Sequence, residues 1–308
     1  MKILITGSTG FVGKNLVPKL VNAGYKLLLP TRNELDLLDQ RQTANYFDNW
    51  KFDTIIHLAA VCGGIGANSK RPYSFIADNL EMNLNLFNYA IDNHIEKVVT
   101  LGSVCAYPKF APIPFVEEDI WKGKPEETNA PYGESKRALM LMCDTANQQF
   151  NLNAVHLIPT NLYGRYDNFN PQTSHVIPAL IKKIQHAIDN NEESVEVWGT
   201  GLASRDFLHV NDLCTAVMIS LESYNSYEPL NLGSGEDIRI KELVTLLCDI
   251  MSYSGRVEWN KDKPDGQPKR QLDITKARKE LGWNPLIELR EGLTDLVNWY
   301  RYNNDKIC

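Results

Sequence analysis

The sequence contains no Cys-x-x-Cys pair, and its cysteines are few and far apart. A chain of 308 residues with six scattered cysteines has neither the density of a disulfide framework nor the spacing of a zinc site. We therefore expect no bound metal, reduced thiols and a cytoplasmic location. The six residues are Cys62, Cys105, Cys143, Cys214, Cys248 and Cys308.

Long apolar runs and an excess of positive charge are also missing. The apolar runs are far shorter than the roughly 18 residues that a membrane-spanning helix needs. Met1–Ile5 reads as the first strand of a fold, and no cleavage site of small residues follows it, so we expect no signal peptide. The formal net charge of -6 argues against nucleic acid or an anionic membrane as the main partner, but is compatible with a small anionic ligand.

Short β-rich runs alternate with helical stretches through the first half of the chain. This alternation predicts βαβ units, hence an α/β fold with a doubly wound, Rossmann-type parallel sheet. Ile3–Ile5 and Thr54–Ile56 do not alternate in polarity, as expected of strands buried on both sides. The expected elements are Lys2–Ile5, Gly13–Ala23, Lys26–Leu29, Thr43–Trp50, Thr54–Leu58, Asn79–Asn93, Val98–Leu101, Gly133–Phe150 and Asn153–Ile158.

After about residue 160 the pattern loosens, and prolines interrupt shorter elements. This change predicts a smaller, mixed α/β domain over the carboxyl ends of the strands, where parallel sheets bind ligands. Phe207–Leu221 looks like a return to the sheet layer. We therefore assign residues 1–163 and about 206–233 to a dinucleotide-binding domain, and residues 164–205 and about 234–308 to a substrate domain.

A glycine-rich turn follows the first strand directly and opens a helix. Glycines at this spacing let the backbone approach a pyrophosphate, whose charge then faces the helix N-terminus. Elsewhere such a turn would be an ordinary connection, but its place in the first βαβ unit predicts a dinucleotide site. The turn consists of Gly7, Ser8, Thr9, Gly10, Phe11, Val12 and Gly13.

The end of the second strand indicates which dinucleotide binds. NAD sites place an acidic residue about 20 residues beyond the glycines, whereas an arginine accommodates the 2′-phosphate of NADP. Arg32 occupies that place, although Glu34 and Asp36 follow closely and a solvated surface arginine is the alternative interpretation. The pattern favours NADP(H).

Tyr132 and Lys136 stand four residues apart and would share one helix face. An ammonium beside a phenol lowers the tyrosine pKa and suits the tyrosine to proton transfer near neutrality. The same spacing recurs at Tyr302 and Lys306 in the polar C-terminal segment, where we consider it accidental. Only Tyr132 begins a long predicted helix and has a serine, Ser103, at the end of the preceding strand.

Ser103, Tyr132 and Lys136 together resemble the catalytic triad of the short-chain dehydrogenases. His57–Ala60, after a β-run, resembles the extended branch of that family, which acts on nucleotide sugars. Longer strings resemble the GDP-L-fucose synthase family over almost the whole chain. They are Gly63–Asn68, Gly102–Pro108, Pro159–Gly164, Asp167–Phe169, Ser174–Leu180, Val197–Gly201, Arg205–Val210 and Lys263–Gly266.

This resemblance implies NADPH-dependent 3,5-epimerisation and 4-reduction of GDP-4-keto-6-deoxy-D-mannose to GDP-L-fucose. The family's reducing triad maps onto Ser103, Tyr132 and Lys136. Its epimerising acid–base pair maps onto Cys105 and His175, residue types that can exchange protons near neutral pH. Without the matched strings, each of these two would more simply be a buried hydrophobe or a satisfied polar residue.

The resemblance also implies binding residues and a homodimer in which Asn79–Asn93 and Gly133–Phe150 pair across a twofold axis. The diphosphate and guanosine contacts map onto Lys183, Trp198, Arg205 and Asp265, although Trp198 also fits a core position and Asp265 a turn. The cofactor contacts comprise the glycine-rich turn and Arg32, together with Leu58, Ala59, Ala60, Leu101, Gly102, Lys136, Pro159, Asn161, Leu162 and His175.

The chain departs from the family at several positions. Ser8-Thr9 replaces a common His-Arg, which removes one potential phosphate-binding arginine and leaves more to Arg32. Val104 replaces a usual serine and Ala106 a larger aliphatic residue, and both changes could reshape the pocket around C5 and C6 of the sugar.

Three other functions stay open. One is a C4-reductase of a related GDP-4-keto sugar, such as a 6-deoxy-heptose, with or without epimerisation. A 4,6-dehydratase or 4-epimerase that recycles bound NAD is disfavoured, because Val104-Cys105 replaces the acidic pair of dehydratases. A non-catalytic NADP-binding protein is disfavoured by the retained Tyr132 and Lys136.

Overall fold

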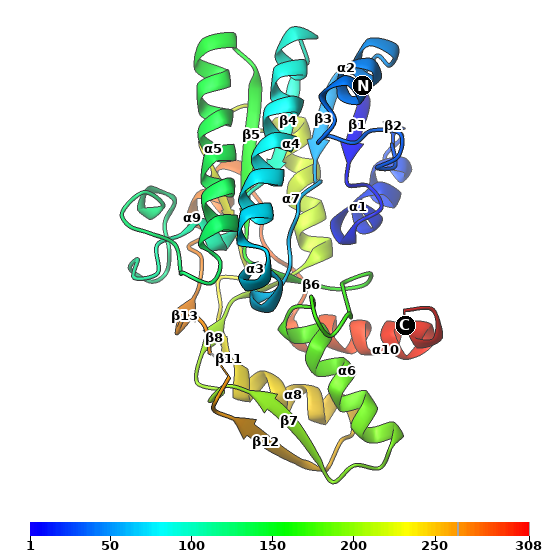
Figure 1. The fold of residues 1–308 in the computed structure, drawn as a ribbon, viewed down its shortest axis with the longest axis vertical. Helices are drawn as coiled ribbons and strands as arrows, with labels where there is room; N and C mark the ends of the chain where they lie inside the picture. Colours follow the sequence, from blue (N-terminus) through cyan, green and yellow to red (C-terminus); the bar gives the residue numbers. More distant parts are fainter. Residues whose placement is uncertain (264, 308) are drawn as a thin grey trace.

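The computed structural model describes residues 1–263 and 265–307, so Pro264 and Cys308 lie outside the described residues. Six strands form the main sheet, and all neighbours in it pair in parallel (Figure 1). Their spatial order is β10 (Leu230–Leu232), β5 (Asn153–Pro159), β4 (Lys97–Leu101), β3 (Thr54–His57), β1 (Lys2–Thr6) and β2 (Lys26–Leu28). β3 and β4 are buried at every position, which confirms the expectation of strands covered on both sides.

Helices cover both faces of this sheet, so the predicted doubly wound α/β fold is confirmed. Each helical layer has its own apolar core, one containing Leu16 and Leu213 and the other containing Leu86 and Leu139. On one face lie α1 (Phe11–Asn22), α7 (Val210–Ser223) and α9 (Thr275–Leu281), and on the other lie α2 (Gln40–Asn49), α4 (Pro72–Asp92) and α5 (Ala130–Phe150).

The helix expected from Asn79 begins earlier, because Pro72 suits a first helical position, where no N–H partner is needed. A short helix, α3 (Ile65–Lys70), precedes it. In the described part of the chain, no helix combines the length and apolar character that crossing a bilayer would require.

A second group of elements lies beyond the carboxyl ends of the main strands, in the lower half of Figure 1. Its core contains Phe169, Ile181, Leu247 and Leu296. The helices are α6 (Val176–Asp189), α8 (Ile240–Met251) and α10 (Leu289–Ile307). The strands are β6 (Asn161–Tyr163) with β9 (Phe207–His209), β7 (Ser194–Trp198) with β12 (Arg256–Asn260), and β8 (Ser204–Arg205) between β11 (Ile238–Arg239) and β13 (Lys269–Arg270).

The segment Phe207–Leu221 returns to the sheet layer only in part. Helix α7 packs on the main sheet as expected, but β9 pairs with β6 and does not join the six strands. The place beside β5 is taken by β10, so β9 pairs instead with the short strand that continues from β5.

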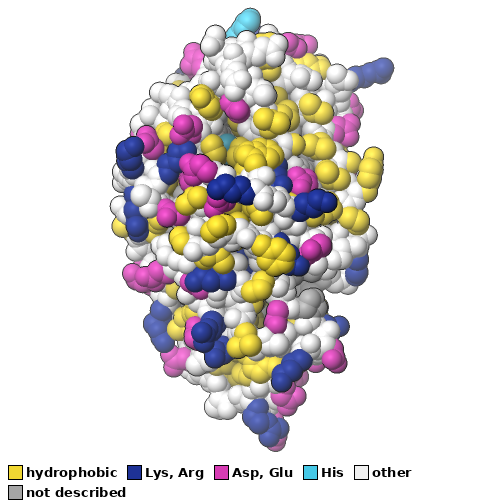
Figure 2. Space-filling view, turned by 90° about the vertical axis from the view of Figure 1, so that its left-hand side faces the viewer, with side chains coloured by type: hydrophobic (Ala, Val, Ile, Leu, Met, Phe, Trp, Pro, Cys, Tyr) yellow, Lys and Arg dark blue, Asp and Glu magenta, His cyan; other side chains and the backbone are white. Residues whose placement is uncertain are grey.

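A projecting segment, residues 107–129, leaves the body between β4 and α5, on the left of Figure 1. It begins after a single helical turn, η1 (Val104–Ala106), and contains another, η2 (Glu117–Asp119). The Tyr107 hydroxyl donates to Asn231 at 2.7 Å, which ties the segment to β10. On the face that Figure 2 shows, acidic and basic side chains are interspersed and hydrophobic side chains gather near the middle.

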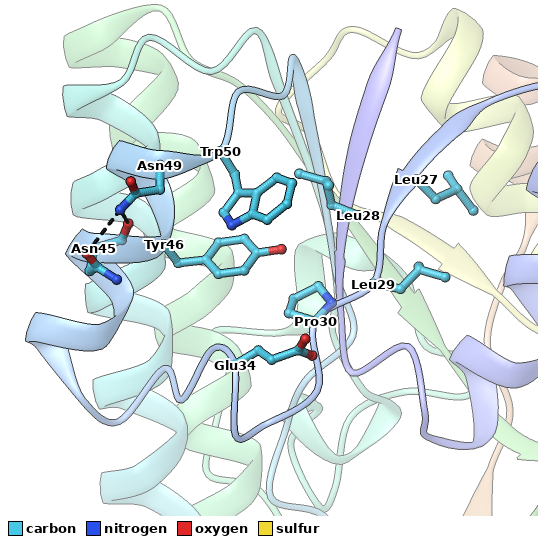
Figure 3. A pocket seen from close by; sticks show the side chains of 9 residues that line it. All are labelled: Leu27, Leu28, Leu29, Pro30, Glu34, Asn45, Tyr46, Asn49 and Trp50. Atoms are coloured by element: carbon cyan, nitrogen blue, oxygen red, sulfur yellow. Dashed lines mark hydrogen bonds between the residues drawn. The ribbon is translucent and has the colours of Figure 1, made fainter.

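A hollow of about 500 Å³ lies at the free edge of the sheet, between β2 and α2 (Figure 3). Tyr46 of α2 and Trp50, directly after this helix, face Leu28 and Pro30 across the hollow. The rings of Tyr46 and Trp50 stack with their centroids 6.0 Å apart. The described residues that line it include none of those predicted for the site, so we assign no part of the site to it.

Asp206 joins the two halves of the molecule. It is fully buried, and its carboxylate accepts hydrogen bonds from the Ser234 N–H at 2.9 Å, the Ser234 hydroxyl at 2.7 Å and the Leu272 N–H at 3.4 Å. Its carbonyl accepts from Thr160 at 3.1 Å and from Asn161 at 2.8 Å. The loops after β5 and β10 are thereby fastened to β9 and to the segment after β13.

We expect Asp206→Ala to lower the free energy of unfolding by about 3 kcal/mol or more, because each buried donor left unpaired costs about 1–3 kcal/mol. Asp48→Ala is the control, since Asp48 is exposed on α2 and should change stability by less than about 0.5 kcal/mol. Urea denaturation of the two variants checks this. Equal losses of stability in Asp206→Ala and Asp48→Ala would show that the Asp206 carboxylate does not hold the two halves of the molecule together.

Candidate active site

The glycine-rich turn lies close to the end of β3. Gly7 has a φ of +70°, and a Cβ there would come 2.7 Å from the Ala59 nitrogen. At Gly13 a Cβ would come 2.4 Å from the Ser8 carbonyl oxygen, so both positions admit only glycine. Gly10 caps α1 without a side-chain hydrogen bond, which leaves the first N–H groups of the helix available to an anion.

The segment after β3 is held beside this turn by a buried histidine. The His57 ring contacts the Thr6 hydroxyl at 2.7 Å and the Asn83 amide oxygen at 3.1 Å. Burial and the nearby charge of Lys136 lower the pKa of His57 to about 4, so its ring is neutral. Leu58, Ala59 and Ala60 are therefore placed along the glycine-rich turn, as the resemblance implied.

Arg32 follows β2 at the same edge of the sheet. Its side chain is 72% exposed and pairs with Asp36 at 3.2 Å. Glu34 accepts from both the N–H and the hydroxyl of Thr31, each at 2.8 Å. Both acidic residues that complicated the cofactor prediction thus have local partners, and Arg32 is an exposed basic group after β2.

Five further predicted cofactor residues lie at the ends of β4 and β5 or in β6, namely Leu101, Gly102, Pro159, Asn161 and Leu162. A Cβ at Gly102 would come 2.5 Å from the His156 ring, so the chain passes close to β5 here. Pro159 ends β5, and Asn161 donates to the Asp206 carbonyl from the start of β6, next to Leu162. The predicted cofactor residues therefore gather along the carboxyl edge of the sheet.

Ser103, Tyr132 and Lys136 meet where β4 faces the start of α5. The Lys136 ammonium donates to the Leu101 carbonyl at 2.8 Å and lies 5.6 Å from the centre of the Tyr132 ring. The Ser103 hydroxyl accepts from the Cys105 N–H at 3.2 Å and favours the ionised form of the nearby Tyr132 phenol. The structure therefore brings the predicted triad together.

The protonation states differ from the sequence-based expectation. Burial raises the pKa of Tyr132 well above its ordinary value, with further upward contributions from Cys62 and Cys105, and the Ser103 hydrogen bond only partly offsets them. Burial also lowers the pKa of Lys136 to about 8. The prediction that Lys136 lowers the tyrosine pKa is therefore wrong for this state, because desolvation dominates. Tyr132 is a protonated phenol and can act as a proton donor.

Cys105 lies in η1, between the triad and a pair of arginines. Arg270 donates from Nη1 to the Cys105 sulfur at 3.5 Å. Arg205 lies nearby and donates to the Asp265 carbonyl at 3.2 Å. Burial and the charge of Arg270 lower the pKa of Arg205 to about 10. Two guanidinium groups thus create positive potential beside the thiol.

His175 is the residue before α6, and it is exposed at the surface. Desolvation by the surrounding protein nevertheless lowers the pKa of its imidazole. Its segment is bound to the loop after β3, because the Gly64 N–H donates to the Thr173 carbonyl at 3.1 Å. Among the described residues, no hydrogen bond or ion pair joins His175 to Cys105 or Tyr132.

The predicted nucleotide contacts surround Trp198 at the end of β7. Trp198 is 54% exposed, which excludes the core interpretation, and the ammonium groups of Lys183 and Lys263 each lie 5.3 Å from its ring centre. Asp265 accepts from the Thr200 N–H and hydroxyl, each at 2.7 Å, so it stabilises a turn.

Three residues of this region were missed in the sequence. Arg270 contacts Cys105, and Lys263, within a string that was matched, lies over Trp198. Asp167 is 7% exposed, and its Oδ2 atom has no hydrogen-bonding partner among residues 1–263 and 265–307. Burial raises the pKa of Asp167 to about 7. No spacing marks Arg270 and Lys263, because each contacts a segment far away in the sequence.

Comparisons with known proteins agree with this geometry. The model of the NAD dependent epimerase/dehydratase family matches residues 3–233, which include the glycine-rich turn and the triad. The chain belongs to the NAD dependent epimerase/dehydratase family. The resemblance noted in the sequence is confirmed by GDP-L-fucose synthase 1 of Arabidopsis thaliana, which is 40% identical over 303 residues, 98% of this chain and 94% of the relative.

Two solved structures of epimerase/dehydratase proteins are also similar. A GDP-6-OMe-4-keto-L-xylo-heptose reductase from C. jejuni superposes with a TM-score of 0.91 at 30% identity and covers 98% of each chain. A GDP-L-fucose synthetase from Naegleria fowleri bound to NADP has a TM-score of 0.89 at 27% identity, over 99% of this chain and 95% of that one. Both are similar over nearly their full lengths.

We expect Asp167→Asn to stabilise the protein at pH 8 more than at pH 5. The raised native pKa means that the folded chain keeps this proton while the unfolded chain loses it, so stability falls as pH rises from about 4 to about 7. An amide removes this loss and keeps the acceptor for the Asn168 N–H at 2.7 Å. Thermal unfolding at pH 5 and pH 8 checks this, and an unchanged pH dependence would contradict it.

Proposed function

We propose that this protein catalyses NADPH-dependent 3,5-epimerisation and 4-reduction of GDP-4-keto-6-deoxy-D-mannose to GDP-L-fucose. The observation that carries this proposal is the placement of Cys105 next to Ser103 and Tyr132, with the Cys105 N–H donating to the Ser103 hydroxyl at 3.2 Å. A group suited to exchanging carbon-bound protons thereby adjoins a reducing triad. The sequence identity of 40% to GDP-L-fucose synthase 1 of Arabidopsis thaliana, over 98% of this chain, supports the same substrate.

The residues present fit a dinucleotide. Because Gly7 and Gly13 carry no side chains, the turn packs directly against the backbone of Ala59 and Ser8, and the uncapped N–H groups at the start of α1 can bind a pyrophosphate. Arg32 would neutralise the 2′-phosphate, a role that the NADP bound by the similar solved structure supports. NADPH, when bound, supplies the hydride that reduces C4.

In the reduction step, the protonated Tyr132 donates its phenolic proton to the C4 oxygen, and Ser103 positions the phenol. The Lys136 ammonium, held by the Leu101 carbonyl, then stabilises the phenolate that remains. The raised pKa of Tyr132 suits this direction, because the tyrosine must carry its proton before reduction begins.

In the epimerisation steps, the 4-keto group acidifies the hydrogens at C3 and C5. Cys105 and His175 form the acid–base pair for these positions. One takes the carbon-bound proton, and the electron pair moves onto the carbonyl oxygen to form an enolate. The other returns a proton to the opposite face. The lowered pKa of His175 keeps its imidazole neutral and therefore able to accept a proton.

The nucleotide end of the substrate would lie against Trp198, with the guanine on the exposed ring. Lys183 and Arg205 would neutralise the diphosphate. Asp265 would hold the turn at Thr200 with its carboxylate and the Arg205 side chain with its carbonyl. We assign residues 1–163 and about 206–233 to the dinucleotide and the remaining residues to the nucleotide sugar.

The second candidate is C4 reduction of a related GDP-4-keto heptose, with or without epimerisation. It is favoured by the similarity to the C. jejuni heptose reductase. Val104 and Ala106 would adapt the pocket around C5 and C6 to a larger sugar. The presence of both Cys105 and His175 favours the epimerising function.

We further propose a homodimer in the cytoplasm. Leu84 on α4 and Leu141 on α5 are about half exposed, and these adjacent helices offer a surface for a twofold interface. A reducing compartment fits the free thiols of the described cysteines.

The decisive experiment incubates the protein with GDP-4-keto-6-deoxy-mannose and NADPH in D2O and identifies the product by NMR. We expect stoichiometric NADPH oxidation with deuterium at C3 and C5. Oxidation without deuterium would leave a simple C4-reductase, and no oxidation would refute activity on this substrate.

Two variants should separate the half-reactions. We expect Cys105→Ser to abolish deuterium exchange while NADPH still binds, because the base is lost. Tyr132→Phe should slow NADPH oxidation by about 10²–10⁴-fold and leave exchange, because it removes only the proton donor at C4. Tyr302→Phe, at the 87% exposed second Tyr-x-x-x-Lys position, is the matched control and should change neither rate. Unchanged exchange in Cys105→Ser would refute its role.

Cofactor preference should depend on Arg32. We expect Arg32→Ala to raise KM for NADPH about tenfold and to leave KM for NADH within about twofold, since only NADPH carries the 2′-phosphate. Arg41→Ala, at an exposed position on α2, serves as the control. Steady-state rates with both cofactors check this. An equal change for both would exclude a contact with the 2′-phosphate.

A further inference from the structure

Arg270 lies against the thiol that the proposed mechanism uses, in a position that no motif marked. We propose that Arg270 holds the Cys105 sulfur as a thiolate and is therefore a positioning residue for the epimerising base. This inference rests on the proposed function, because it concerns the same side chain, but its physical content is a property of the protein without substrate.

Both partners of this contact are anchored. Arg270 is 7% exposed, and its Nε donates to Gln267 at 2.8 Å while Nη1 reaches the Cys105 sulfur at 3.5 Å. Gln267 in turn donates to the Lys109 carbonyl at 2.8 Å. The Arg270 carbonyl accepts from the Asp206 N–H at 2.9 Å. The guanidinium therefore cannot easily turn away from the sulfur.

The charge balance favours an anion at this place. In the described parts of the chain, no carboxylate lies within 4.0 Å of the Arg270 guanidinium, although a buried cation normally requires a counter-charge. Arg205 adds a second positive charge nearby, and its guanidinium donates to the backbone carbonyls of Ser204 at 2.7 Å and Asp265 at 3.2 Å. A thiolate beside Arg270 supplies the missing negative charge without any added ligand.

Apart from the two arginines, the groups that lie near Cys105 do not supply a positive charge. Tyr132 and Cys62 both interact with the thiol, and desolvation raises the pKa of each, so both stay protonated at neutral pH. A Cys105 thiolate would accept a proton from C3 or C5, so an S–H bond forms as the C–H bond breaks and the electron pair moves to the enolate oxygen. Arg270 keeps its own proton and its charge throughout this step.

The test measures the ionisation of Cys105 directly. Iodoacetamide alkylates thiolates, so its rate at each pH from 5 to 10, read by mass spectrometry of the peptide that carries Cys105, gives the midpoint at which this thiol ionises. No substrate or cofactor is present. We expect Arg270→Met to move the midpoint upward by about one pH unit or more and to slow alkylation at pH 7 about tenfold.

Three matched variants accompany this measurement. Arg270→Lys retains a cation and should keep the midpoint within about half a unit of the wild-type value, even if Arg270→Met folds poorly. Arg205→Met should move the midpoint less than Arg270→Met, because Arg205 makes no hydrogen bond to the sulfur in the described structure. Cys62→Ala confirms that the modified sulfur is that of Cys105. Thermal unfolding reports whether each variant is folded.

The pH profile of deuterium exchange gives a second readout, and its alkaline shift in Arg270→Met should match that of alkylation. Equal alkylation midpoints in wild type, Arg270→Lys and Arg270→Met would overturn the ion pair while leaving the proposed function intact. Conversely, an Arg270-dependent midpoint in a protein that exchanges no deuterium would retain the ion pair and refute the epimerase function.

Discussion

The structure depends on one buried carboxylate, that of Asp206, at the meeting point of its two halves. Its oxygens and its backbone bind the ends of β5 and β10 on one side and the β13 segment on the other. Burial raises the pKa of Asp206 to about 6, so the interaction is retained at neutral pH at the cost of desolvating a charge. Because the Asp206 N–H also binds the Arg270 carbonyl, the same junction that joins the two halves of the molecule holds the backbone of Arg270, whose side chain contacts Cys105.

Desolvation is the second general property of the site. It raises the pKa of Tyr132 and lowers that of Lys136, and it keeps His57 neutral behind them. Desolvation thus favours the neutral forms of Tyr132, Lys136 and His57, whereas Arg205 and Arg270 retain their positive charges. The region is therefore electropositive before any ligand binds, which suits a nucleotide diphosphate and the enolate oxygen that epimerisation would form.

The sequence predicted those parts of the fold and site that depend on local backbone geometry. The glycine-rich turn, the strand end at Ser103 and the four-residue spacing of Tyr132 and Lys136 were all recognisable, because strand–helix connections and helical periodicity place such residues predictably. Arg270 was not recognisable, since it lies 165 residues from Cys105 in a strand of two residues. The predicted pKa of Tyr132 was wrong for a related reason, because spacing shows which charges are neighbours but not how much water reaches them.

The exposed position of Arg32 has a consequence for the evolution of coenzyme use. Among the described residues its side chain pairs with Asp36 and belongs to none of the apolar cores, so its replacement would leave the folded state nearly unchanged. The glycine-rich turn, in contrast, tolerates almost no variation at Gly7 and Gly13. With the role proposed for Arg32, selection could alter which coenzyme is preferred through a single surface position, while the capacity to bind a dinucleotide at all would remain tied to the stability of the fold.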